Sequence, residues 1–143
     1  DPGAEDRLSA DGFAGLQRLF AAKMDMRWLS GAVLDRYRAE WSRPGRLTGM
    51  LNWYRATPLR VARPDQPLDL PLLPAAAGRI AMPHLVIWGE DDAALLPVSL
   101  DGLDTWCTDL TIRRLAGADH WICHQKPADV AALITEYLTF RGL

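Results

Sequence analysis

The sequence predicts an α/β fold in which residues 81–143 form the closing portion of a doubly wound parallel sheet and residues 1–60 form a helical segment. Residues 84–88 (HLVIW) are a short continuous apolar run, which is typical of a strand covered on both faces. A second strand is predicted at residues 110–115. The order strand, helix, strand, helix indicates two parallel strands joined by a right-handed crossover. Because two parallel strands alone leave open edges, we expect them to belong to a larger sheet.

Three helices are predicted in the first half of the chain. Residues 8–22 carry apolar side chains at helical spacing. A second helix is expected over residues 30–42, where Ser30 offers a capping side chain. A third runs over residues 45–57 and ends before Pro58, because the residue that precedes a proline is disfavoured in a helix.

The second half is predicted to contain two helices, at residues 97–106 between the strands and at residues 127–140 after them. Between the halves, residues 61–78 hold four prolines and show no sustained period, which indicates an extended connector. We therefore divide the chain into residues 1–60, a connector of residues 61–80, and residues 81–143.

The composition of the chain argues against two classes of function, nucleic-acid binding and membrane insertion. The chain has 143 residues and a formal net charge of -2, with 49% apolar and 24% charged residues. Its arginines are scattered and offset by acidic residues, which favours a solvated helix face over a nucleic-acid-binding patch. No apolar run approaches the roughly 18 residues that a membrane-spanning helix requires, so we expect no nucleic-acid partner and no membrane segment.

The chain begins with Asp1-Pro2-Gly3, without an initiator methionine or an apolar leader, so we expect a mature, trimmed or truncated product. Cys107 and Cys123 lack CxxC spacing and clustered histidines. They are expected to be free thiols in a reducing compartment, which favours a cytoplasmic location.

The residues that carry chemistry follow the two predicted strands. Asp92 follows the first strand and a glycine turn, and His120 lies in the loop after the second strand. Open α/β sheets place catalytic groups beyond the carboxyl ends of parallel strands. A carboxylate bound to one imidazole nitrogen fixes the tautomer and leaves the other nitrogen free to activate water. We predict that Asp92 and His120 form a catalytic pair; the alternative is that Asp92 caps a turn and His120 bonds to backbone.

Nearby polar residues compete for these roles. Glu90 and Asp91 are alternatives to Asp92, which is preferred because a glycine three positions earlier lets a turn aim its carboxylate inward. Asp119 is not expected to pair with His120, since adjacent side chains seldom point the same way.

We interpret His84 and His124 as structural residues. No Cys or carboxylate stands at ligand spacing from them, so we expect no metal and no cofactor.

An acid followed by a histidine is the chain order of a hydrolytic triad whose nucleophile comes first. No plausible nucleophile precedes the pair in this sequence. The sequence therefore contains two of the three members of such a triad.

The segment from Pro83 to Leu138, with MPHLVIWGEDDAALLP and LAGADHWICHQKPADVAALITEYL, resembles the C-terminal end of α/β-hydrolase-fold enzymes. Residues 37–45 and 47–55, the latter containing LNWYR, resemble the cap domain of soluble epoxide hydrolases and their dehalogenase relatives. The resemblance implies that residues 1–60 are a partial helical cap and residues 81–143 the C-terminal part of the α/β-hydrolase core.

The resemblance also implies roles for individual residues. Asp92 would be the triad acid, His120 the general base, and Tyr54 one of two tyrosines that polarise the epoxide oxygen, although Tyr54 packing the cap is the alternative. Trp53 and Trp121 would contact a small apolar substrate, an epoxide or a related compound. A phenol stays protonated at neutral pH, so it can donate a hydrogen bond to the oxygen as the C–O bond breaks.

Three functions remain open at this stage. The first is epoxide hydrolysis through an Asp nucleophile missing from this chain, with the N-terminal half of the fold as partner. The second is haloalkane or haloacetate dehalogenation, for which Trp53 could bind halide. The third is a noncatalytic fragment that associates with another chain, including a copy of itself.

Overall fold

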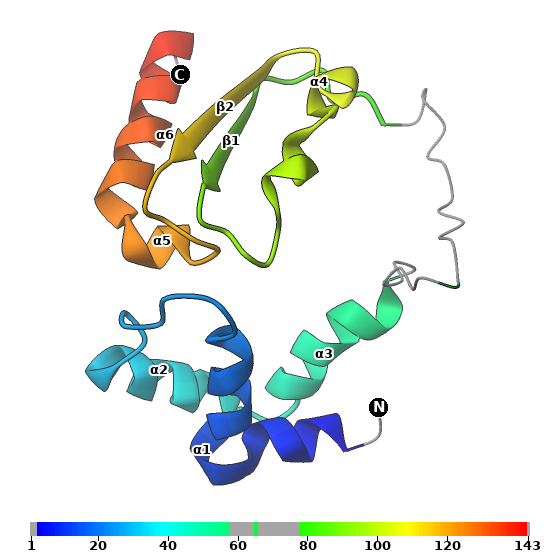
Figure 1. Cartoon of the computed structure of the whole chain (residues 1–143), viewed down its shortest axis with the longest axis vertical. Coiled ribbons are helices and arrows are strands. Elements are labelled where there is room, and N and C mark those ends of the chain that lie inside the picture. The colour runs from blue at the N-terminus through cyan, green and yellow to red at the C-terminus, as the bar shows by residue number, and fades with distance from the viewer. Residues whose placement is uncertain (1–2, 58–64, 66–77, 143) are drawn as a thin grey trace. The chain divides into compact units, whose positions relative to one another are not determined.

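The computed structural model describes residues 3–57, 65 and 78–142 (Figure 1). The chain divides into two compact units. We call the first the helical unit, which comprises Asp1–Ala22 and Leu29–Leu72, and the second the sheet unit, which comprises Lys23–Trp28 and Leu73–Leu143.

The helical unit contains α1 (Ala4–Phe20), α2 (Gly31–Trp41) and α3 (Arg46–Ala56). The predictions for the second and third helices are confirmed to within one residue at each end. A left-handed Gly45 (φ 74°) separates α2 from α3, a conformation that glycine adopts without steric cost.

The prediction for the first helix is only partly correct, because α1 begins earlier than residue 8 and is interrupted. Asp11, Gly12 and Phe13 have left-handed backbone (φ 51°, 63° and 66°). The two halves of α1 approach closely at Gly15, where a Cβ atom would lie 2.5 Å from the backbone oxygen of Arg7. Helical periodicity detects the apolar face but not this reversal, which left-handed residues and a missing side chain permit.

The core of the helical unit is aromatic. The Trp41 ring lies 5.6 Å from Phe13, 5.8 Å from Phe20 and 5.5 Å from Tyr37 between ring centroids. Trp41 is 5% exposed and Leu16 only 2%. Burial of these side chains stabilises the packing of α1 against α2.

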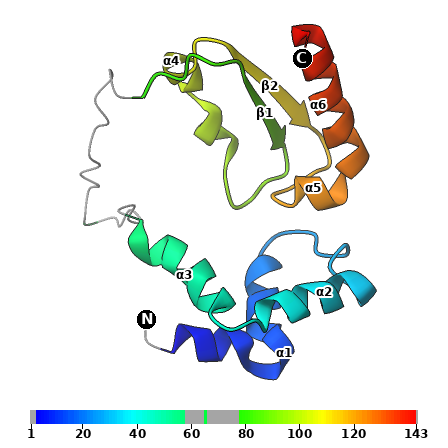
Figure 2. The ribbon, with the colours of Figure 1, turned by 180° about the vertical axis from the view of Figure 1, so that it is seen from behind.

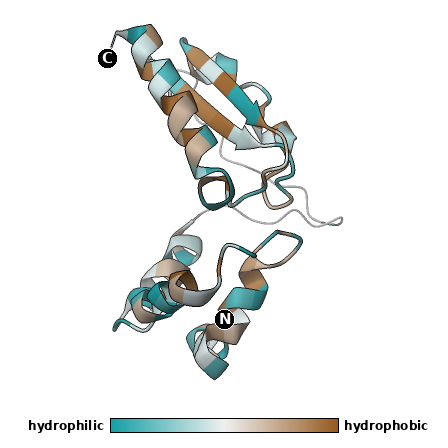
Figure 3. Cartoon of the chain, turned by 90° about the vertical axis from the view of Figure 1, so that its left-hand side faces the viewer, coloured by the Kyte–Doolittle hydropathy of each residue, from teal (hydrophilic) through white to brown (hydrophobic). Residues whose placement is uncertain are grey.

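The sheet unit contains two parallel strands, β1 (His84–Gly89) and β2 (Leu110–Leu115), paired from His84 with Leu110 to Gly89 with Leu115. The prediction of a parallel pair is confirmed. The helix α6 (Pro127–Arg141) lies beside the two strands, as both the front view and the back view show (Figures 1 and 2). It confirms the prediction of a helix at residues 127–140. Hydrophobic residues lie along the strands and on α6 (Figure 3).

The connection between the strands differs from the prediction of one helix. It consists of the 3-10 helix η1 (Pro97–Leu100) and the short helix α4 (Leu103–Trp106). Asp101 is extended and Gly102 is left-handed (φ 76°), which ends one helix and begins the next. A further short helix, α5 (Ile122–Gln125), follows the histidine loop and was not predicted.

The predicted connector of residues 61–80 lies almost wholly outside the described residues. Among the described helices, none combines the length and the apolar character needed to cross a bilayer.

Both cysteines are free thiols. Cys107 is buried and Cys123 is exposed.

Candidate active site

The structure brings Asp92 and His120 together, although 28 residues separate them. The Nδ1 atom of His120 lies 3.0 Å from Oδ2 of Asp92. The Asp92 side chain is 8% exposed and that of His120 is 35% exposed. The pair therefore combines a buried carboxylate with an imidazole that reaches solvent.

The loop after β1 holds the carboxylate of Asp92 in place. Its Oδ1 atom accepts hydrogen bonds from the backbone N–H groups of Ala94 and Leu95, both at 2.8 Å. Burial, the largest single influence, raises the pKa of Asp92. Hydrogen bonds from Leu95, His120 and Ala94 together outweigh burial, so the pKa lies below its ordinary value. Asp92 is therefore ionised at neutral pH and accepts hydrogen bonds at both oxygens.

A close backbone approach aligns the two loops. A Cβ atom at Gly89 would lie 2.5 Å from the backbone oxygen of Ala118 and 2.6 Å from that of Asp119. The backbone N–H of Asp91 donates to the same Ala118 oxygen at 2.9 Å. The glycine at the end of β1 is therefore required for the loop that carries His120 to rest directly on the loop that carries Asp92.

This arrangement can perform acid–base chemistry. With Nδ1 donating to the Asp92 carboxylate, the imidazole is held in the tautomer that leaves Nε2 unprotonated. An Nε2 atom on a partly exposed ring can remove a proton from water, and the nearby carboxylate stabilises the resulting imidazolium.

The other predicted site residues fall into two groups. Trp121 lies in the sheet unit, where its ring meets that of His120 edge-on with 5.5 Å between centroids. Trp53 and Tyr54 lie on α3 in the helical unit and are 78% and 74% exposed. Of these three residues, only Trp121 belongs to the same unit as Asp92 and His120 and contacts that pair.

The competing acidic residues have other surroundings. Glu90 and Asp91 are exposed. Asp119 is 7% exposed, and its carboxylate accepts hydrogen bonds from backbone N–H groups of Asp25 and Trp121. Their positions agree with the expectation that Asp92, and not a neighbour, pairs with His120.

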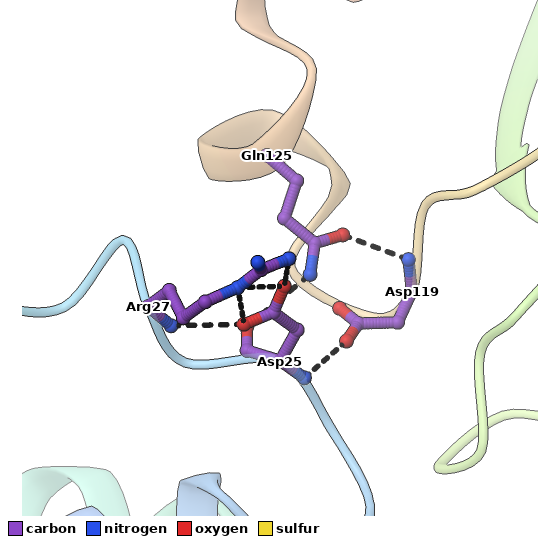
Figure 4. A network of polar contacts seen from close by, with 4 residues as sticks. All are labelled: Asp25, Arg27, Asp119 and Gln125. Atoms are coloured by element: carbon purple, nitrogen blue, oxygen red, sulfur yellow. Dashed lines mark hydrogen bonds and ion pairs between the residues drawn. The ribbon is translucent and has the colours of Figure 1, made fainter.

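Sequence reasoning missed the segment Lys23–Trp28, which packs on the histidine loop (Figure 4). The Trp28 ring stacks on His124 with 3.8 Å between centroids and an angle of 2° between planes. Arg27 forms an ion pair with Asp25 at 2.5 Å, and hydrogen bonds from Arg27 lower the pKa of that carboxyl. Nothing in a six-residue stretch between helices signals contacts about a hundred residues away.

A cavity of about 780 Å³ opens between this segment and the loops of the sheet unit. Its lining includes Trp28, Asp91, Asp119 and Lys126 but not His120. In the part of the chain that the structure describes, no group of three or more His, Cys, Asp or Glu side chains could hold a metal ion.

Comparison with known proteins adds independent information, although no family model matches the chain. The chain is 35% identical over 105 residues to AB hydrolase superfamily protein YfhM of Bacillus subtilis, covering 73% of this chain and 33% of that protein. It is 32% identical over 113 residues to epoxide hydrolase A of Mycobacterium tuberculosis, covering 78% of this chain and 32% of that protein.

Solved structures give the same result. An epoxide hydrolase of Bacillus megaterium matches 97% of this chain and 48% of its own length, with a TM-score of 0.75 and 25% identity. An epoxide hydrolase from metagenomes of hot environments matches with a TM-score of 0.75 and 32% identity, over 96% and 47% of the two chains.

The chain therefore spans about a third of these curated relatives and about half of these solved ones. These similarities show that it has the fold of the C-terminal part of an α/β-hydrolase, with a cap segment and the last strands, and that its relatives are epoxide hydrolases and an α/β-hydrolase superfamily protein.

Proposed function

We propose that this chain supplies the acid–base part of an epoxide hydrolase active site, and that the N-terminal half of the fold supplies an Asp nucleophile. The observation that carries the proposal is the contact between Nδ1 of His120 and Oδ2 of Asp92 at the ends of two parallel strands. The names of the similar proteins favour an epoxide as substrate.

The first step forms an ester. A carboxylate oxygen of the missing Asp attacks an epoxide carbon, the ring C–O bond breaks, and the ring oxygen takes a proton from a tyrosine. Tyr54 is the candidate proton donor, because its side chain is a phenol and is 74% exposed on α3. Trp53 and Trp121 are candidates to contact a small apolar substrate.

The second step hydrolyses the ester. Nε2 of His120 takes a proton from water, whose oxygen attacks the ester carbonyl carbon. Collapse of the intermediate releases the diol, as the imidazolium returns its proton to the leaving oxygen. The second proton of the water is left on the Asp carboxyl group and passes to the deprotonated tyrosine, which regenerates both the carboxylate and the phenol. Asp92 orients His120 and stabilises its charge throughout.

The proposed partner is the upstream part of the same fold. Among the described residues, β1 and β2 form a sheet of two strands, which leaves one edge of each without a strand neighbour. Two free thiols fit a reducing compartment, and we place the activity in the cytoplasm.

Turnover of matched substrates tests the proposal. The chain would be combined with the upstream half of the fold, then supplied with an aromatic epoxide or with a haloalkane of similar size. We expect diol from the epoxide, no halide from the haloalkane, and no product from the chain alone. Halide release without diol would identify a dehalogenase instead. A stable dimer of the chain that neither binds the upstream half nor turns over substrate would favour the noncatalytic function.

A further inference from the structure

We propose that Asp119 and Gln125 are positioning residues that fix His120 by clamping the segment Lys23–Trp28 to the histidine loop. Only one part of this inference, the effect of the two residues on turnover, rests on the proposed function. Its structural part concerns the orientation of one imidazole and can be tested without any reaction.

The carboxylate of Asp119 forms the centre of the clamp. Its Oδ2 atom accepts a hydrogen bond from the backbone N–H of Asp25 at 2.7 Å, and its Oδ1 atom accepts one from the backbone N–H of Trp121 at 2.8 Å. The residue is 7% exposed. Hydrogen bonds from backbone N–H groups to a buried carboxylate are among the stronger ones in proteins, so this side chain holds both segments firmly.

The side chain of Gln125 completes the clamp from α5. Its Oε1 atom accepts a hydrogen bond from the backbone N–H of Asp119 at 2.8 Å, and its Nε2 donates to the backbone oxygen of Asp25 at 3.2 Å. Both backbone polar groups of Asp25 are therefore bound, as Figure 4 shows. An amide side chain is suited to this position because it both accepts and donates.

The clamp acts on both sides of His120. The N–H of Asp119 belongs to the peptide unit one residue before the histidine, and the N–H of Trp121 belongs to the peptide unit directly after it. With both bound, the backbone is held on each side of His120, which restrains the direction of its side chain towards the carboxylate of Asp92.

The same segment reaches the His120 ring by a second route. Trp28 packs against Trp121 with 5.4 Å between ring centroids, and Trp121 meets His120 edge-on. Trp28 is in turn stacked on His124, which lies four residues beyond His120 in α5. The segment thus supports the histidine through its backbone and through an aromatic contact.

The clamp also has a consequence for the chain as a whole. Ala22 and Leu29, the residues that flank the segment, belong to the helical unit. The segment is therefore continuous in sequence with the helical unit at both ends, and it is hydrogen-bonded to the loop that carries the proposed base. Because catalytic groups must be held to within about 0.5 Å, such support is expected to matter for rate.

Two nearly isosteric substitutions break the clamp. Asp119→Asn replaces one acceptor oxygen by an NH₂ group that faces an N–H, and Gln125→Glu removes the donor to the Asp25 oxygen. The readout is the Nδ1 proton resonance of His120, measured by NMR on the whole chain with labelled histidine. We expect this proton to exchange with water at least tenfold faster in each variant, with the circular dichroism spectrum unchanged.

Two control substitutions separate positioning from general stability. Asp91→Asn removes the same charge from the same cavity lining at an exposed side chain. Leu100→Ala removes buried apolar atoms of η1 and lowers stability without touching the clamp. Both are expected to leave the His120 resonance as in the unmodified chain. Should Asp119→Asn fail to fold, Gln125→Glu decides alone.

The proposal is overturned if the His120 resonance is unchanged in the folded clamp variants, or if Leu100→Ala alters it equally. In the assembled protein, the clamp variants are expected to lower kcat for an epoxide by about 10- to 100-fold and to change KM less than twofold. If the clamp variants show faster exchange of the His120 Nδ1 proton, but the assembled unmodified protein does not turn over an epoxide, the clamp is supported and the proposed function is refuted. Unchanged kcat in an active protein would refute the catalytic part of the clamp.

Discussion

At the scale of single residues, the ionised carboxylate of Asp92 determines what the site can do. It receives two backbone hydrogen bonds on one oxygen and contacts His120 with the other. A carboxylate in this position holds the imidazole with Nε2 available, whereas a neutral amide permits the wrong tautomer. The chemistry of His120 therefore depends on the backbone that surrounds Asp92.

The lowered pKa of Asp92 predicts a pH-dependent contribution to stability. Its native pKa lies below the ordinary value of 3.8, so the contribution is present above pH 4 and is lost as pH falls through the native pKa. Asp92→Asn is expected to cost about 1–3 kcal/mol at pH 7. The difference from the unmodified chain should shrink towards pH 3. Urea unfolding at both pH values measures it, and a difference that grows on acidification would contradict the assignment.

Tyr54 gives a second prediction at this scale. Tyr54→Phe removes one hydroxyl from a side chain that is 74% exposed, so the free energy of unfolding should change by less than about 0.5 kcal/mol. In the assembled protein the loss of a donor to the developing oxyanion should lower kcat by roughly 10²-fold. Steady-state assays with an epoxide check this, and unchanged kcat would leave Tyr54 a surface residue of the cap.

At the scale of elements, the end of β1 and the histidine loop behave as one structure. Gly89→Ala places a methyl group 2.5 Å from the Ala118 oxygen, so the loop has to move. We expect a destabilisation of about 1–3 kcal/mol and a weakened contact between Asp92 and His120.

The matched control is Gly49→Ala in α3, where nothing lies within 4 Å of the new Cβ. A helix interior favours alanine over glycine, so this change should stabilise the chain by about 0.5–1 kcal/mol. Thermal unfolding of both variants distinguishes the positions. Equal effects would mean that the approach at Gly89 carries no constraint.

The packing of the helical unit can be tested with a pair of tryptophans. Trp41 is 5% exposed and Trp53 is 78% exposed. Trp41→Ala should therefore cost about 3–5 kcal/mol, and Trp53→Ala less than about 0.5 kcal/mol. Denaturant unfolding followed by far-ultraviolet circular dichroism measures both. A large loss from Trp53→Ala would show that its ring is packed and not available to a substrate.

These elements also show which features could be predicted from the sequence and which could not. The strand β1 was predictable because a continuous apolar run is a strong local signal, and α6 because a proline at its first position precedes a long stretch without glycine or a further proline. The break in α1 and the division between η1 and α4 were not, because the first depends on three left-handed residues and the second on one. Asp92 and His120 were predictable from their places after strands. The contacts of Asp25 and Gln125 were not, since they join residues 100 apart.

At the scale of the whole molecule, the sheet unit leaves large apolar side chains exposed to solvent. On α6, Ile134, Leu138 and Phe140 are 42%, 40% and 83% exposed, and the strands are mostly half-buried. Large exposed apolar side chains, together with strand edges that lack a strand neighbour among the described residues, indicate a surface that other elements cover. The upstream half of the fold is the occupant that the proposed function requires.

Association with that half is therefore a prediction of its own. Mixing the chain with a separately produced upstream half should give a 1:1 complex that is heavier than 15.9 kDa by the mass of the added part. The exchange protection of backbone amides in β1 and β2 should rise on binding. Native mass spectrometry and hydrogen exchange test this, and two species that remain separate, with unchanged protection, would oppose it.

The most direct test of the central claim is to trap the ester. In the assembled protein, His120→Gln removes the base for the second step and leaves the first step intact. After mixing with an epoxide, the polypeptide that carries the nucleophile should gain the mass of one epoxide molecule, while the unmodified protein releases diol. If His120→Gln instead turns over at the normal rate without a mass increase, His120 is not the base and the proposed function is wrong.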